Sequence, residues 1–396
     1  MEKTVSILVL GDIGRSPRMQ YHAYSFLKRD YKVQLIGYLE SRIFENLMNE
    51  RHLTVLPVKT LTFLNYLPTI FRILLKSLWL FFSLIFTLLK SKHSNYFLVQ
   101  NPPCFPSLVV VYLLCKIRGT VLICDWHNYT WSFEFFLGRL AHKNICVSKA
   151  MREDLWIHNI HSSVLYDRPH EKYKKLQEYE RKSLKKTFLS KTRLQFEFDF
   201  ELAAKENCAF LISSTSWTID EKFDTLLDAL IEYDEIKNRN VLNIPTLLVV
   251  ITGKGHLKSR YENTIKNLRL KNITFIMPWL SEMDYIDILA ACDLGVCLHA
   301  STSKLDLPMK VLDMFGSNLP VLALNYDCLD ELVINEYNGY TFETSHDLCI
   351  HIMNMLSNFP NNSSKLNQIR DNIEDFLSTE TWDSNWNNVM KNILID

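Results

Sequence analysis

The sequence lacks an excess of charge of either sign, because lysine plus arginine and aspartate plus glutamate each total 44. The whole chain therefore gives no electrostatic reason to expect a nucleic-acid partner. Its nine cysteines show no CxxC pair and no His/Cys metal-ligand spacing, which disfavours disulfides and structural zinc and is typical of reduced thiols in a cytosol-facing protein. No internal repeat or low-complexity tract stands out. No cleavable signal peptide is expected either, because Met1–Leu10 leads directly into Gly11 as a first strand.

Length and composition predict two domains of the α/β class. A chain of 396 residues, 47 % apolar and 22 % charged, exceeds the range of one hydrophobic core and has ample material for two. Short apolar runs alternate with longer helix-like segments, which is typical of parallel sheets wound with helices. The predicted strands are Val5–Leu10, Val33–Tyr38, Leu53–Val58, Tyr96–Gln100, Val121–Cys124, Asn144–Val147, Phe210–Ser214, Thr246–Thr252, Ile273–Met277, Leu294–Leu298 and Val321–Ala323. The predicted helices of the first half are Pro17–Arg29, Pro68–Lys90, Pro106–Ile117 and Lys149–His158, the last capped by Ser148.

The strand pattern predicts two Rossmann-like domains, 1–170 and 208–345, each with a parallel sheet. Between them, 171–207 is a polar, Lys/Glu-rich stretch that we interpret as an interdomain insert. The last segment, 346–396, is helical in pattern and is expected to pack back across a cleft between the domains. Ligands of such sheets gather at the carboxyl ends of the strands, so site residues are sought there.

One apolar stretch, Leu61–Leu89, is interrupted only by Arg72 and Lys76. Its uncharged part, Ser77–Leu89, is too short for a confident spanning helix, which needs about 20 apolar residues. An interfacial or re-entrant helix with Trp79 as an anchor is the preferred interpretation. A helix buried in the first domain is the alternative.

The loop after the first strand, GDIGRSPRMQYHA, carries a carboxylate and two cations. Gly11 and Gly14 permit a tight turn before a helix, but they lack the GxGxxG spacing of a nicotinamide-dinucleotide site. Asp12, Arg15 and Arg18 suit an acceptor with a hydroxyl to deprotonate and phosphates to hold. An ordinary helix-start turn with solvated charges is the alternative interpretation.

A second candidate loop, CDWHNYTWS, follows the strand Val121–Cys124. Asp125 or His127 can accept a proton from a sugar hydroxyl. The aromatic side chains of this loop offer faces for stacking on a sugar or a lipid; they are Trp126, Tyr129 and Trp131.

Three loops of the second half predict a nucleotide diphosphate site. Each combines polar groups with a helix start, where backbone amides face an anion; the residues are Ser214 and Ser216, Gly253 and Lys254, and Ser303. Lys310 adds a point charge, and Asp313 on the same helix face can accept from ribose hydroxyls. Helix caps, and a packed helix with two surface charges, are the alternatives.

These elements resemble the two-domain GT-B glycosyltransferases, whose C-terminal domain holds the nucleotide sugar and whose N-terminal domain holds the acceptor. In order and spacing, six motifs are similar to those of the chitobiosyldiphosphodolichol β-mannosyltransferase family, and together they span Gly11 to Gly316. The motifs are GDIGRSPRMQYHA, QNPPCFPSL, CDWHNYTWS, CVSKAMREDL, SSTSWTIDEKF and DLPMKVLDMFG.

The resemblance implies inverting transfer of mannose from GDP-mannose to the distal GlcNAc of dolichyl-diphosphate chitobiose, on the cytosolic face of the endoplasmic reticulum membrane. It also implies other early-pathway glycosyltransferases as candidate partners. By family likeness Asp313 is the ribose-binding acid, and Asp12 is the favoured general base, with Asp125 and His127 as rivals. Another lipid-linked glycosyltransferase and a non-catalytic nucleotide-sugar or lipid-binding subunit are the alternative functions.

Three features depart from the family pattern or its relatives. Leu305 stands where many GT-B enzymes carry the first Glu of an E-x7-E pair. We expect no N-terminal membrane helix before the first strand, so membrane attachment is expected to rest on 61–89 or on a partner. No DxD motif lies at a strand end. No cofactor is required by the sequence, and an assisting divalent cation has no identified site.

Overall fold

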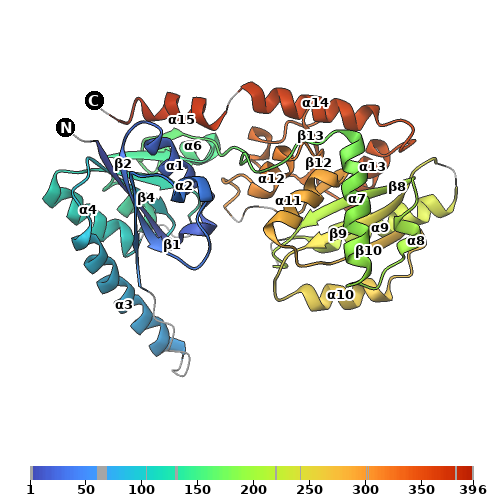
Figure 1. The fold of residues 1–396 in the computed structure, drawn as a ribbon, viewed down its shortest axis with the longest axis horizontal. Helices are drawn as coiled ribbons and strands as arrows, with labels where there is room; N and C mark the ends of the chain where they lie inside the picture. Colours follow the sequence, from blue (N-terminus) through green and yellow to red (C-terminus); the bar gives the residue numbers. More distant parts are fainter. Residues whose placement is uncertain are drawn as a thin grey trace. The chain divides into compact units, whose positions relative to one another are not determined.

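The structure is a computed structural model that describes residues 3–59, 69–103, 105–129, 133–218, 221–240, 242–299, 301, 303–379 and 381–394. The chain forms two compact units, Met1–Tyr166 together with Trp382–Asp396 as unit 1, and Asp167–Thr381 as unit 2. Each unit carries its own parallel sheet, which confirms the predicted α/β class (Figure 1).

Unit 1 has a seven-stranded sheet in the order β3-β2-β1-β4-β5-β6-β7, parallel throughout. Its strands are β1 (Thr4–Asp12), β2 (Lys32–Tyr38), β3 (Leu53–Pro57), β4 (Tyr96–Asn101), β5 (Val121–Trp126), β6 (Lys143–Cys146) and β7 (Ser162–Val164). Its helices are α1 (Pro17–Leu27), α2 (Glu45–Met48), α3 (Thr69–Lys90), α4 (Ser107–Arg118), α5 (Phe133–Gly138), α6 (Lys149–Ile157) and α15 (Trp382–Met390). Six consecutive residues of β1 are buried, as expected of a central parallel strand covered on both faces.

The last helix, α15, belongs to the core of unit 1 although it lies more than 200 residues beyond β7 in sequence. Trp386, Met390 and Ile393 are buried in the same cluster as Val5 and Phe26. Trp386 also packs edge-on against the Phe26 ring, with 5.0 Å between centroids. The chain end therefore completes the sheet-covering layer on the α1 side.

Unit 2 has a six-stranded parallel sheet in the order β10-β9-β8-β11-β12-β13. Its strands are β8 (Cys208–Ser214), β9 (Thr246–Thr252), β10 (Ile273–Ile276), β11 (Leu294–Cys297), β12 (Val321–Leu324) and β13 (Gly339–Phe342). Its helices are α7 (Glu178–Arg193), α8 (Phe200–Ala203), α9 (Phe223–Asn238), α10 (Lys258–Asn267), α11 (Glu282–Ala291), α12 (Met309–Gly316), α13 (Ser345–Met355) and α14 (Ser364–Thr379).

The polar segment 171–207 lies inside unit 2 and contains α7 and α8. Three ion pairs join it to α11: Lys172–Glu282 (2.6 Å), Lys174–Asp287 (2.6 Å) and Lys191–Asp284 (3.1 Å). The many lysines and glutamates of this segment are therefore explained by its position on the outside of a neighbouring helix.

Helix α3 presents an exposed apolar stripe. Seven of its large side chains are between 41 % and 66 % exposed, and their helical spacing puts all of them on one face: Phe71, Leu75, Leu78, Trp79, Phe82, Phe86 and Leu89. Leu84 and Leu88 point the other way and are buried. In the part of the chain that the structure describes, no helix combines the length and the apolar character needed to cross a membrane.

Candidate functional site

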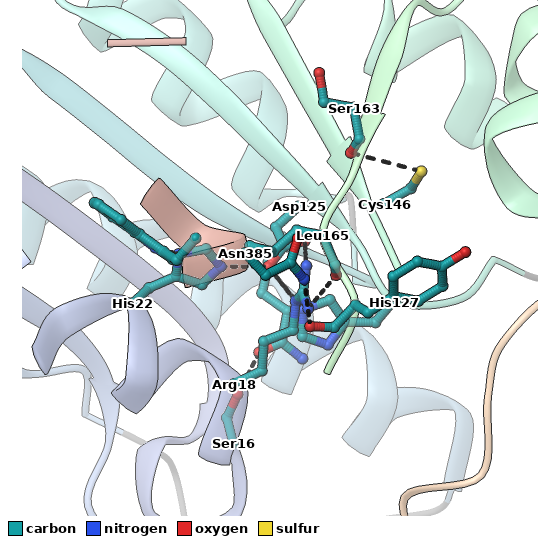
Figure 2. Close-up of polar contacts among 12 residues, drawn as sticks. Ser16, Arg18, His22, Asp125, His127, Cys146, Ser163, Leu165 and Asn385 are labelled. Carbon is teal, nitrogen blue, oxygen red and sulfur yellow. Dashed lines mark hydrogen bonds and ion pairs between the residues drawn. The ribbon is translucent and has the colours of Figure 1, made fainter. Parts of the chain in front are cut away.

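The centre of the unit 1 site is a buried carboxylate, Asp125, near the carboxyl end of β5. Arg18, at the start of α1, donates to both of its oxygens, at 2.8 Å from Nε and 3.0 Å from Nη2, and to the Leu165 carbonyl at 2.8 Å from Nη1. Both side chains are almost fully buried. Arg18 was predicted to hold acceptor phosphates; the geometry instead commits its guanidinium to Asp125 (Figure 2).

His22, one turn along α1 from Arg18, is buried between Asp125 and the C-terminal helix. Its Nε2 lies 3.2 Å from Asp125 Oδ2, and Trp386 Nε1 lies 2.9 Å from its Nδ1. Because an indole nitrogen only donates, Nδ1 of His22 must accept, and its Nε2 must carry the proton that is donated to Asp125. His22 is therefore neutral here, consistent with burial lowering its pKa.

His127 is the member of this cluster that solvent can reach. Its side chain is 21 % exposed, whereas those of Asp125 and His22 are fully buried. Nε2 of His127 lies 3.1 Å from Asp125 Oδ2, so a proton on Nε2 leaves Nδ1 as the accepting nitrogen. Burial alone would raise the pKa of Asp125, but the charge of Arg18 and the hydrogen bonds from His127 and His22 hold it well below its usual range. Asp125 is thus a fixed anion that orients His127.

The aromatic side chains of this loop do not all face outward. Trp126 is fully buried and donates from Nε1 to Asn144 Oδ1 at 2.9 Å, so the prediction that it stacks on a ligand is wrong. Tyr129 is partly buried and hydrogen-bonded to Asp154. Trp131 lies outside the described residues.

The loop after β1 is organised around Asp12. Its Oδ1 accepts from the backbone amides of Glu40 and Ser41, both at 3.1 Å, while the exposed Arg15 places Nε 3.5 Å from Oδ2. Burial opposes ionisation, but the hydrogen bonds from Ser41 and Glu40 hold the pKa of Asp12 below its usual value. These contacts give Asp12 a clear role in fixing the loop after β2.

The two glycines of this loop differ in their surroundings. A Cβ on Gly14 would lie 2.6 Å from the Arg42 carbonyl oxygen, so only glycine permits this close approach. A Cβ on Gly11 would meet nothing nearer than 3.9 Å. Gly14 therefore has a packing role and Gly11 has no such requirement.

In unit 2, a hydrogen-bonded chain links Ser214, at the carboxyl end of β8, to Asp313 on α12. Ser214 Oγ lies 3.0 Å from the hydroxyl of Tyr285 on α11, and that hydroxyl lies 3.4 Å from Asp313 Oδ2. Burial raises the pKa of Asp313 to about 6. The sequence predicted Ser214 and Asp313 at this site but missed Tyr285, which joins them from a helix whose pattern gives no signal of function.

Lys310, one turn before Asp313, forms an ion pair with Glu221. Glu221 is 4 % exposed, and it also accepts from the amides of Ser216 (2.7 Å) and Trp217 (3.2 Å). The sequence analysis missed Glu221, although this acid follows the hydroxyl-rich loop after β8. It holds Lys310 and that loop together, so the polar groups predicted separately at Ser216 and Lys310 form one assembly.

The remaining predicted donor-site residues lie on neighbouring loops. Cβ atoms on Gly253 and Gly255 would lie 1.6 Å and 1.9 Å from carbonyl oxygens of the loop after β8, so both glycines serve loop-to-loop packing. Lys254 is exposed, with its ammonium 3.8 Å from the centre of the Trp279 ring. Ser303 Oγ donates to Asp306 Oδ1 at 3.0 Å, which shapes the loop before α12.

Within the described residues, no group of three or more His, Cys, Asp or Glu side chains is placed to hold a metal ion.

Known proteins resemble this chain over nearly its full length. The model of the family "Glycosyl transferases group 1" matches residues 195–374. Chitobiosyldiphosphodolichol beta-mannosyltransferase of Homo sapiens is 36 % identical, over 99 % of this chain and 92 % of that protein. A protein of Arabidopsis thaliana named UDP-glycosyltransferase TURAN is 34 % identical, over 98 % of this chain and 96 % of its own.

Solved structures show the same architecture. The crystal structure of HepE of Anabaena in complex with UDP matches with a TM-score of 0.67 and 15 % identity, over 99 % of both chains, a likeness that concerns the fold. Together with the sequence relatives, this confirms both the GT-B fold and the enzyme class. The chain therefore belongs to the chitobiosyldiphosphodolichol β-mannosyltransferase family of GT-B glycosyltransferases.

Proposed function

We propose that this glycosyltransferase moves mannose from GDP-mannose to the distal GlcNAc of dolichyl-diphosphate chitobiose, with inversion, at the cytosolic face of the endoplasmic reticulum membrane. The observation that carries the proposal is the Asp125–His127 pair of unit 1, a base held by a permanent anion at a strand end. The relatives' printed names supply the acceptor class, and their identity of 34–36 % extends over most of the chain.

In this proposal Nδ1 of His127 accepts the proton of the attacking sugar hydroxyl, while Asp125 stabilises the imidazolium that forms. Unit 2 holds the donor. Lys310 and the amides of the Ser303 loop neutralise the departing diphosphate, and Asp313 with Tyr285 binds the ribose. Asp12 keeps the acceptor loop in shape, and the exposed Arg15, whose Nε lies 3.5 Å from Asp12 Oδ2, is placed to approach acceptor phosphates.

The test is release of GDP from GDP-mannose that depends on lipid-linked chitobiose. A parallel assay with UDP-sugars matters because one relative is named a UDP-glycosyltransferase. If the enzyme turns over UDP-glucose but not GDP-mannose in an acceptor-dependent way, it is a different lipid-linked glycosyltransferase. Nucleotide binding without turnover of any sugar would make it a non-catalytic subunit.

Donor binding should weaken when Lys310 or Asp313 is replaced by alanine, because a charged hydrogen-bonding partner of the nucleotide is removed. A loss of about 1.5–3 kcal/mol, or about 10- to 100-fold in the dissociation constant, is expected by calorimetry with GDP. Lys310→Ala also leaves the buried Glu221 unpaired, so Lys310→Met/Glu221→Gln is the better-folded variant. Lys266→Ala, an exposed lysine of α10, is the matched control.

The same assignment has a pH signature. Because the pKa of Asp313 is raised to about 6, its carboxylate gains a proton as pH falls through that value. GDP affinity of the wild type should then decline between pH 7.5 and pH 5.5, and this decline should be absent from Asp313→Asn. If GDP affinity is unchanged in all of the Lys310 and Asp313 variants, α12 is not part of the donor site.

Membrane contact through α3 is part of the proposal, supported by the exposed stripe of that helix. Leu78→Ser/Leu89→Ser removes two side chains that are 55 % and 66 % exposed. Each buried leucine contributes about 1.5–3 kcal/mol, so liposome flotation should fall by more than about tenfold. The matched control is Leu194→Ser/Leu242→Ser, two exposed leucines of unit 2. If the α3 double variant and the control double variant float equally well, the apolar stripe of α3 does not bind the membrane.

A further inference from the structure

Unit 2 contains a cavity of about 410 Å³ that the donor chemistry does not use. It is lined by α7, by the start of β8 at Cys208 and Phe210, by Asp293 just before β11, and by the start of α14. Cys208 and Asp293 mark the amino ends of β8 and β11, whereas Ser214 of the donor site lies at the carboxyl end of β8. A ligand of this cavity would therefore lie at the opposite sheet edge from the nucleotide. Figure 1 labels the two helices of this lining, α7 and α14, in unit 2.

The lining of the cavity is rich in cations. Three carboxylates, Glu178, Glu206 and Asp293, face six basic side chains: Arg181, Lys182, Lys185, Lys186, Lys205 and Arg370. Two of the carboxylates are already paired, Glu178 with Lys182 at 2.8 Å and Asp293 with Lys185 at 2.5 Å. Asp293 also accepts from the Phe210 amide at 2.8 Å. The cavity is therefore electropositive, in a chain whose overall charge is zero.

Arg370 is the cation that most needs a partner. It is only 6 % exposed, and its Nη1 donates to Asn367 Oδ1 at 3.1 Å. Its Nε is buried without a hydrogen-bond partner among the described residues, while the charges of Asp293 and Glu178 act to raise its pKa. These two carboxylates are already paired with lysine side chains, so the buried guanidinium is costly unless a further anion joins it.

A second arginine adds to this imbalance. Burial, and then the nearby charge of Arg181, lower the pKa of Arg370 to about 10 against the opposing effect of Asp293 and Glu178, so Arg370 still carries its charge at neutral pH. Arg181 donates from Nη1 to the Leu176 carbonyl at 3.1 Å, which fixes its position without neutralising it. Two like charges held together around a cavity are the arrangement that a phosphate between them would relieve.

The cavity also has an apolar wall, including Leu189, Leu366 and Phe359. The ammonium of Lys185 lies 4.8 Å from the Phe210 ring centre and 5.6 Å from that of Phe359. The volume lies within the range of small-molecule sites. We propose that this cavity is a second, non-catalytic site that binds a small organic anion carrying phosphate groups, with Arg370 as its anchor.

The test is calorimetry of the full chain with inorganic diphosphate in the presence of saturating GDP, which occupies the donor site. We expect one further diphosphate to bind, and Arg370→Gln or Arg181→Gln to weaken it at least tenfold. Lys191→Gln, on the same helix but paired with Asp284, is the control and should bind as the wild type does. Absence of binding in the wild type, or equal binding in Arg370→Gln, overturns the site.

Thermal melting checks the fold of the variants and gives a second readout. Arg370→Gln removes an unpaired buried charge, so its melting temperature without ligand should equal or exceed that of the wild type, while the rise caused by diphosphate disappears. A parallel arm uses vesicles containing phosphatidic acid. Vesicle binding that depends on Arg370, with weak diphosphate binding, would identify a lipid headgroup as the source of the phosphate.

Discussion

Replacing His127 by alanine should lower turnover at saturating substrates by about 10²–10⁴, the usual contribution of a general base. His127 is the solvent-reachable group of the buried cluster, and Asp125 holds its Nε2 at 3.1 Å. The measurement is single-turnover GDP release with lipid-linked chitobiose. GDP affinity should stay nearly unchanged, because the donor contacts that we propose are all in unit 2.

The informative comparison is Asp12→Asn. Sequence resemblance favoured Asp12 as the base, but its Oδ1 is engaged by the amides of Glu40 and Ser41. Asparagine retains that accepting oxygen, so Asp12→Asn should cost much less turnover than His127→Ala. A nearly inactive Asp12→Asn beside an active His127→Ala would return the base to the first loop. Equal losses would indicate one shared network and end the single-base assignment.

Much of the fold was predictable because parallel strands buried on both faces leave continuous apolar runs. Thr246–Thr252 was predicted with its observed bounds, and Ser148 caps α6 as expected, with its side chain accepting from the Met151 amide. The strands β7 and β13 were missed. β7 has the sequence SSV and β13 the sequence GYTF, so neither is an apolar run, and their pairing with β6 and β12 comes from the rest of the sheet.

The site was predictable as a set of loops but not as a set of contacts. Strand ends indicated where Asp125, His127 and Ser214 would stand, since ligands gather there in parallel sheets, and Asp313 was placed by its helix face and by family likeness. The bond from Arg18 to Asp125 joins residues 107 apart, and the bond from Trp386 to His22 joins residues 364 apart. Periodicity and motif spacing carry no information about such distant pairs, and for that reason Arg18 was assigned to the acceptor.

These distant pairs make the Asp125 site depend on three parts of the chain. Trp386 fixes which nitrogen of His22 is protonated, His22 donates to Asp125, and Asp125 orients His127. The hydrogen bonds from Trp386 to His22 and from His22 to Asp125 must be buried, because water would otherwise compete for the same donors and acceptors. Stability of unit 1 and geometry of the base are therefore coupled through Asp125.

Replacing Arg18 by methionine should reveal that coupling as a loss of stability of about 3–5 kcal/mol, the expected cost of leaving a buried charge without its partner. Methionine keeps much of the side-chain volume but none of the donors, so both oxygens of Asp125 lose their shortest contacts. The measurement is chemical denaturation of the full chain at pH 8. Arg18→Met/Asp125→Asn is the matched variant, and it should recover most of the loss because the buried pair is then neutral.

The pH dependence gives the sign test. In the wild type the depressed pKa of Asp125 contributes stability at neutral pH that is lost only as the pH falls below the usual range of a carboxyl. Without Arg18, burial raises that pKa, so protonation of Asp125 relieves the buried charge. The stability gap between Arg18→Met and wild type should therefore narrow from pH 8 to pH 5. A gap that widens in acid, or a double variant as unstable as Arg18→Met, would show that Arg18 acts through packing rather than through the charge of Asp125.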